Sequence, residues 1–110
     1  MNIYVDIDET ICYYEGERDY EKALPIRKNI EKINSLYDAG HKITYWTARG
    51  TVTGKYWMLL IVKQFEEWGV KYHTIKIGKP AYDLFIDDKA LNGISDWGKI
   101  DEYIENHGKN

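Results

Sequence analysis

The chain has 110 residues, a formal net charge of −3, an apolar fraction of 44% and an aromatic fraction of 15%. These values predict one folded domain over residues 1–110 and exclude both a disordered chain and the basic surface of a nucleic-acid binder. The single cysteine, Cys12, excludes an internal disulfide, and no apolar run is long enough for a bilayer, so a cytoplasmic location without signal peptide or membrane contact is expected.

The first part of the chain predicts strand, excursion, helix and strand. Residues Ile3–Ile7 are rich in β-branched side chains, typical of a buried strand, and the polar and aromatic stretch Glu9–Lys22 predicts a short flap such as a small hairpin. Pro25 suits the first residue of a helix that Gly40 ends, and Ile43–Thr47 predicts the second strand. The apolar face of this helix repeats at helical spacing: Ile26, Ile30, Ile33 and Tyr37.

The second part continues the alternation. A helix is predicted over Thr53–Trp68, and its segment Tyr56–Val62 is apolar almost all round, which predicts contact with another subunit in a homo-oligomer. Tyr72–Ile77 predicts a third strand and Leu84–Ile86 a short fourth one. Asp96 is predicted to cap a last helix. The apolar face of that helix holds four residues: Trp97, Ile100, Tyr103 and Ile104.

Alternating strands and helices predict an α/β fold, a three-layer Rossmann-like parallel sheet with helices on both faces. Ligands of such folds bind beyond the carboxyl ends of the strands. Each predicted strand ends in polar residues or is followed by them: Asp6 and Asp8, Thr47, Lys79, and Asp87 and Asp88.

Two acidic pairs point to a metal ion. Asp6 and Asp8 are two residues apart, so their like charges repel unless a cation or a shared proton holds them. Asp87 and Asp88 add negative charge if the fourth strand lies beside the first. Ligand sets made only of oxygen suit Mg²⁺, which is usually bound together with substrate phosphates.

Thr47 and Lys79 supply a hydroxyl donor and a positive charge, both suited to a phosphate. Taken singly, an Asp after a strand is more often a turn or a helix cap, Thr47 an ordinary strand residue and Lys79 a solvated side chain. Joint placement at successive strand ends is what predicts a functional site.

In this order the residues resemble the four motifs of the haloacid dehalogenase (HAD) superfamily. Asp6-Ile7-Asp8-Glu9-Thr10 is similar to its DxDxT motif, and Thr47 matches the second motif. Lys79 before Pro80 matches the third, and Asp87-Asp88 the fourth in its adjacent-Asp form. Three segments also resemble small phosphatases of capsule and surface-polysaccharide biosynthesis: 46–50, 78–80 and 85–90.

The resemblance implies a HAD-like core and a magnesium-dependent phosphomonoesterase, a hydrolase acting on a small phosphorylated metabolite, with a sugar phosphate favoured. Asp6 would form an aspartyl-phosphate. Asp8 would protonate the leaving oxygen and later accept a proton from water. Thr47 and Lys79 would hold the phosphoryl oxygens.

The resemblance also implies the metal ligands and the substrate contacts. Mg²⁺ would be held by Asp6, the backbone carbonyl of Asp8 and Asp87. Asp88 would act through a water molecule or by contacting one of these ligands. Thr10 is assigned to the substrate site because it would orient Asp8 or its loop. Arg49 is assigned to the same site because it follows Thr47 by two residues. The spacing leaves room for a short flap but for no cap domain.

Two other functions stay open at this point. An open site would also suit a phosphatase for nucleotides or nucleic-acid ends, although the acidic balance counts against long nucleic acid. A phospho-accepting signalling domain also gathers Asp, Thr and Lys at strand ends, but Lys79 precedes the second acidic pair here, which disfavours that order. Continuous phosphate release separates an enzyme from a signalling domain.

Overall fold

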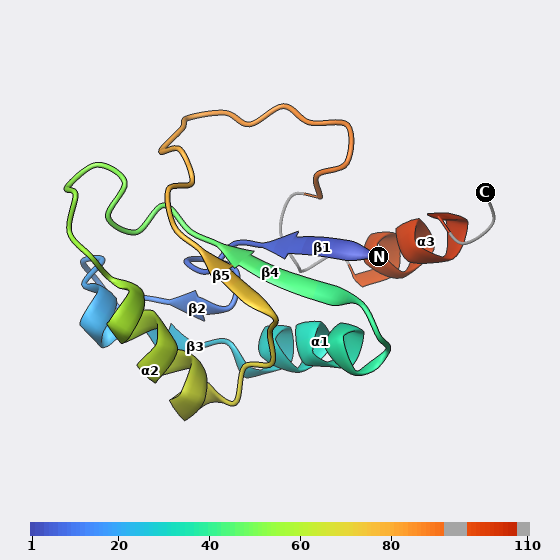
Figure 1. Ribbon diagram of the computed structural model, residues 1–110, viewed down its shortest axis with the longest axis horizontal. Coiled ribbons are helices and arrows are strands. Elements are labelled where there is room, and N and C mark those ends of the chain that lie inside the picture. The colour runs from blue at the N-terminus through green and yellow to red at the C-terminus, as the bar shows by residue number, and fades with distance from the viewer. Residues whose placement is uncertain (92–96, 108–110) are drawn as a thin grey trace.

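A three-stranded parallel sheet organises the fold. The computed structural model describes residues 1–91 and 97–107. Strands β1 (Asn2–Val5), β4 (Lys42–Trp46) and β5 (Thr74–Lys76) lie in the order β1-β4-β5 (Figure 1). These strands confirm the first three predicted ones with slightly different ends, and because they are parallel their carboxyl ends meet at one edge of the sheet.

Helices α1 (Arg27–Asp38) and α2 (Met58–Trp68) lie on the same face of this sheet (Figure 1). Helix α3 (Trp97–His107) contacts α1, because Lys32 Nζ lies 2.7 Å from Asp101 Oδ1. The molecule is therefore a mixed α/β fold with a parallel sheet flanked by helices, consistent with a Rossmann-like arrangement. The predicted cap of α3, Asp96, lies outside the described residues.

Two predicted helix starts are wrong. Pro25 belongs to β3 (Leu24–Pro25), where it pairs with Cys12, so α1 begins two residues later at Arg27. The second helix begins at Met58 instead of Thr53. Residues 50–57 form a loop in which Gly50 and Gly54 both have positive φ, a conformation that a helix does not contain.

The flap after β1 is a small hairpin, as predicted. Strand β2 (Cys12–Tyr13) pairs antiparallel with β3, and a short 3-10 helix, η1 (Tyr20–Lys22), lies between them. Asp19 accepts a hydrogen bond from the backbone N–H of Glu21 at 3.1 Å and so caps η1. The hairpin therefore fixes the flap close to the end of β1.

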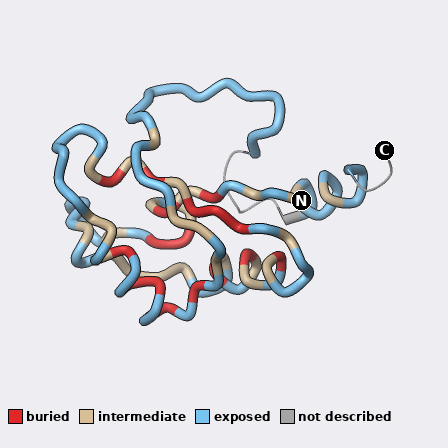
Figure 2. Tube along the Cα trace, viewed as in Figure 1, coloured by how far each residue is buried: buried red, intermediate tan, exposed pale blue. Residues whose placement is uncertain are grey.

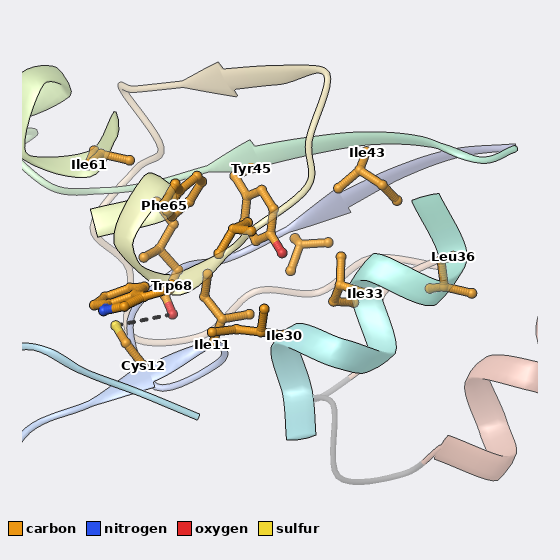
Figure 3. Packing of buried hydrophobic residues seen from close by; sticks show 13 residues of the cluster. Ile11, Cys12, Ile30, Ile33, Leu36, Ile43, Tyr45, Ile61, Phe65 and Trp68 are labelled. Atoms are coloured by element: carbon orange, nitrogen blue, oxygen red, sulfur yellow. Dashed lines mark hydrogen bonds between the residues drawn. The ribbon is translucent and has the colours of Figure 1, made fainter. Parts of the chain in front are cut away.

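The core lies between the sheet and the helices α1 and α2. Ile43 and Tyr45 of β4 point toward Ile33 of α1 and Phe65 of α2 (Figure 3). The Tyr45 and Phe65 rings meet edge to face with centroids 4.8 Å apart. On the other sheet face Tyr4 and Trp46 are in ring contact, and Tyr4 is half-exposed. The predicted layer of helices on both faces is thus formed on one face by α1 and α2.

The predicted fourth strand is wrong in this structure. Leu84–Ile86 is irregular and exposed, with Ile86 at 87% exposure, and it belongs to a long segment that is pale blue in Figure 2. A three-residue strand is stable only when it pairs with a neighbour. Within residues 1–91 and 97–107, β1 pairs only with β4, so its outer edge has no strand beside it.

Two apolar side chains of α2 that the sequence assigned to a subunit contact are exposed: Leu59 at 78% and Val62 at 41%. Self-association through this face stays a prediction. None of the helices in the described part of the chain has the length and apolar character needed to cross a membrane.

Candidate active site

Asp6, Thr47 and Lys79 follow the three parallel strands at their common carboxyl edge. Strand β4 lies between β1 and β5, so Lys79 reaches across the end of β4 to meet Asp6. The distance between Lys79 Nζ and Asp6 Oδ2 is 3.4 Å. The structure therefore brings together the carboxylate of Asp6 and the ammonium of Lys79, which are 73 residues apart in sequence.

Lys79 is held by its backbone and by two aromatic rings. Its N–H donates to Thr47 O at 3.1 Å, and its carbonyl accepts from Thr51 Oγ1 at 2.8 Å. Its ammonium lies 6.0 Å from the Trp46 ring centroid and 5.5 Å from that of Tyr82. Cation–π attraction and burial, with the side chain only 13% exposed, keep the charge directed at Asp6.

Asp6 is the accessible carboxylate of the site, with 39% of its side chain exposed. Its Oδ1 accepts the N–H of Ile7 at 2.8 Å, which leaves Oδ2 toward Lys79. Glu9 follows in the left-handed region at φ 60°, which is uncommon for a residue with a side chain. Such backbone conformations persist where surrounding contacts enforce them, often at functional loops.

Thr47 and Thr10 are placed by backbone contacts. Thr47 is buried, and its Oγ1 accepts the N–H of Arg49 at 3.1 Å, so its hydroxyl keeps its own hydrogen to donate. The carbonyl of Thr10 accepts from Asn29 Nδ2 at 2.8 Å, which ties the Asp6–Thr10 loop to α1. The predicted orienting role of the Thr10 side chain stays a prediction.

Asp8 is buried in an ion pair. Arg49 donates from Nε to Asp8 Oδ2 at 3.1 Å and from its terminal nitrogen to Oδ1 at 2.8 Å. The hydroxyl of Tyr14 donates to the same Oδ1, and the Cys12 thiol lies 3.3 Å from it. Burial alone would raise the pKa of Asp8, but the hydrogen bonds and charge of Arg49 outweigh it, so the pKa lies below its ordinary value.

The position of Arg49 differs from the expected one. Its guanidinium is fully buried, with 0% side-chain exposure, and it donates to Gln64 Oε1 at 2.7 Å as well as to Asp8. It also stacks on Tyr20 at 4.7 Å from the ring centroid. A buried arginine needs a carboxylate partner, and Asp8 supplies it, whereas the predicted contact of Arg49 with substrate stays a prediction.

Tyr14 and Gln64 complete this cluster, and sequence reasoning did not assign them to it. Gln64 Nε2 donates to the carbonyl of Tyr20 in the flap at 2.6 Å, so one amide joins α2, Arg49 and the flap. The sequence offers only a weak signal, because α2 also carries Lys63, Glu66 and Glu67, and only the structure shows that the Gln64 side chain is buried, at 4% exposure. Such a signal does not identify the partner.

The structure does not bring Asp87 and Asp88 to Asp6. Both are exposed, and Asp87 Oδ1 accepts the N–H of Lys89 at 2.7 Å in a local turn. Among residues 1–91 and 97–107, no three His, Cys, Asp or Glu side chains come close enough to hold a metal ion. The predicted metal set is thus separated because the strand that would carry Asp87 and Asp88 to the site does not form.

A cavity of about 270 Å³ lies beside the site, between the flap and the loop after β4. Its wall includes Ala48, next to Thr47, and Ala81, two residues beyond Lys79. The bond between Thr51 and Lys79 joins these two loops. The lining residues are Arg18, Tyr20, Ala48, Gly50, Val52, Thr53, Lys55, Trp57 and Ala81.

Gly50 sets the shape of this loop. Its φ is +83°, and a Cβ there would lie 2.2 Å from Lys55 O. We expect Gly50→Ala to lower the free energy of unfolding by about 2 kcal/mol or more, because the left-handed conformation and the backbone clash both add cost. Gly54→Ala is the control: φ is +73° but nothing lies within 4 Å. Urea unfolding giving equal losses for the two variants would contradict the close approach.

A solved structure resembles the fold of this chain. No family model matches the chain, and no curated protein matches it. The crystal structure of a structural-genomics target from Vibrio cholerae is similar, with a TM-score of 0.79 and 25% sequence identity. The similarity covers 96% of this chain and 98% of that chain. It therefore extends over the whole α/β arrangement described above.

Proposed function

We propose that this chain is a capless HAD-type phosphatase. It hydrolyses a small phosphorylated metabolite, with a sugar phosphate of polysaccharide biosynthesis favoured, through an aspartyl-phosphate on Asp6. One observation carries the proposal: the accessible Asp6 carboxylate faces the Lys79 ammonium at 3.4 Å, across the strand end that bears Thr47. A nucleophile beside a fixed cation is what transfer of an anionic phosphoryl group requires.

The chemistry has two steps. First, Asp6 attacks phosphorus, the bond between phosphorus and the ester oxygen breaks, and the alcohol leaves with a proton supplied by Asp8. Then water attacks the aspartyl-phosphate, Asp8 accepts its proton, and inorganic phosphate leaves Asp6 free. Lys79 and Thr47 stabilise the charge on the phosphoryl oxygens in both steps.

The ion pair between Asp8 and Arg49 matters for the first step. Arg49 stabilises the ionised form of Asp8, in which it holds no proton to give. The proposed acid step therefore requires this pair to loosen when a phosphate ester enters. Loosening of the pair would also change the contacts of Tyr14, because its hydroxyl donates to Asp8 and accepts from Arg49 at 3.2 Å.

Asp6 fits a magnesium ion as a single carboxylate ligand. Mg²⁺ keeps several waters and needs only one or two protein carboxylates with the substrate phosphate, so Asp6 and the Asp8 carbonyl suffice as protein ligands. When bound there, the ion would shield Asp6 from the charge of the ester. Participation of Asp87 and Asp88 requires residues 84–88 to move beside β1, at the edge where no strand of residues 1–91 or 97–107 pairs with it.

The test is phosphate release from p-nitrophenyl phosphate. We expect continuous release with Mg²⁺ and a loss of at least about a hundredfold with excess EDTA, since the ion is required to neutralise charge at the site. Heat-inactivated protein is the control for phosphate release without an enzyme. Release that stops after about one phosphate per chain would reject turnover and favour the signalling domain.

A further inference from the structure

The cavity beside the site is placed to receive the part of a substrate that carries the phosphate. Two residues of its wall lie in the loops that hold Thr47 and Lys79: Ala48 comes directly after Thr47, and Ala81 comes two residues after Lys79. The hydrogen bond from Thr51 Oγ1 to Lys79 O, at 2.8 Å, fixes these loops relative to each other. A phosphate at Asp6 and Lys79 would therefore have its organic group adjacent to the cavity.

The apolar part of the wall suits a single ring. Tyr20 and Trp57 meet edge to face with ring centroids 5.0 Å apart, and both are partly exposed. Aromatic rings provide rigid apolar surface. The volume of about 270 Å³ lies just below the ~300–1,000 Å³ of drug-sized sites, which favours one sugar unit over a larger ligand.

The polar part of the wall is positive. Arg18 and Lys55 line the cavity and none of its lining residues is acidic, whereas the whole chain carries a net charge of −3. Arg18 is paired with Glu9 at 3.2 Å. Lys55 forms no ion pair with any residue in 1–91 or 97–107, so its charge is available to a ligand.

We propose that this cavity binds the sugar of the substrate and selects sugar phosphates that carry a second anionic group, a carboxylate or another phosphate. Lys55 and Arg18 meet the second anion, and Tyr20 and Trp57 contact the ring. The proposal rests on the proposed function for the position of the first phosphate. The specificity of the cavity comes from charge, because a sugar phosphate without a second anionic group has nothing to pair with Lys55.

The test compares two ligands that differ only at one carbon: glucuronic acid 1-phosphate and glucose 1-phosphate. Each is titrated into the full-length, isotope-labelled protein in EDTA, and dissociation constants are taken from amide chemical shifts. We expect the carboxylated ligand to bind about fivefold more tightly to the wild type, as a partly exposed charge pair gives. The shifted amides should lie in residues 48–57 and the flap.

Three variants make the test specific. Lys55→Met, which removes the charge and keeps an unbranched side chain one atom shorter, should reduce the fivefold preference to about one, and Lys55→Arg should retain it. Lys42→Met is the matched control, because Lys42 is exposed at the opposite end of β4 and should keep the preference. Equal binding of both ligands to the wild type, or an unchanged preference in Lys55→Met, would overturn the proposal.

Glucose 1,6-bisphosphate tests whether the cavity accepts a second phosphate as well as a carboxylate. Binding at least as tight as that of glucuronic acid 1-phosphate, and dependent on Lys55, supports recognition of any second anion. The titration does not depend on turnover. Hydrolysis of p-nitrophenyl phosphate without a preference between the ligands would reject only the role of the cavity, whereas a Lys55-dependent preference without hydrolysis would reject the phosphatase.

Discussion

Replacing Asp6 by Asn should lower the rate of phosphate release from p-nitrophenyl phosphate by roughly 10⁴-fold or more, because the amide cannot act as the nucleophile. The fold should survive, since Asn is isosteric and its oxygen can still accept the N–H of Ile7. Initial rates of phosphate release with Mg²⁺ measure the effect, and circular dichroism checks the fold.

The matched control is Asp38→Asn. Asp38 is an exposed carboxylate at the end of α1, where it is paired with Lys71 at 2.8 Å. Its variant should keep the wild-type rate. Turnover at the wild-type rate in Asp6→Asn would sink the assignment of the nucleophile, even with the fold intact.

Replacing Arg49 by Met should lower the free energy of unfolding by about 3–5 kcal/mol, the cost of leaving a buried charge without its partner. Asp8 is 10% exposed and Arg49 is not exposed at all, so water cannot replace the lost hydrogen bonds. Gln64 Oε1 also loses its donor. Urea unfolding at pH 7 measures the change.

Two further measurements tie this loss to the ion pair. Arg18→Met removes an exposed arginine paired with Glu9 and should cost less than about 1 kcal/mol. The folded-state pKa of Asp8 is lowered, so its contribution is complete above the ordinary carboxyl pKa of about 4 and is lost as the pH falls through the lowered value. A stability difference between wild type and Arg49→Met that does not shrink below pH 4 would argue against the pair.

Most elements of the fold follow from local sequence patterns. The strand around Val5 and the helix around Ile33 have the correct type because burial of one face imposes a period that the sequence displays. The helix starts at Pro25 and Thr53 are wrong because a tertiary pairing and a glycine loop replace the first turns. Leu84–Ile86 has the composition of a strand, but composition does not supply a pairing partner.

The site is predictable to the extent that strand ends determine it. Parallel strands bring Asp6 and Lys79 to one edge, so their proximity follows from topology. The partner of Asp8 does not follow from topology, because the residues around Arg49 in sequence do not determine whether its side chain extends to solvent or turns inward. Its burial depends on Gln64 from a helix 15 residues further along the chain, a contact that only the packed structure defines.

Gln64 links the flap to a helix that forms no part of the cavity wall. One end of its amide accepts from Arg49, and the other donates to the backbone of Tyr20. A change in how α2 packs is thereby transmitted both to Asp8 and to the aromatic side of the cavity. Variation in ligand preference among related chains can thus arise from substitutions inside α2, at positions that never meet the ligand.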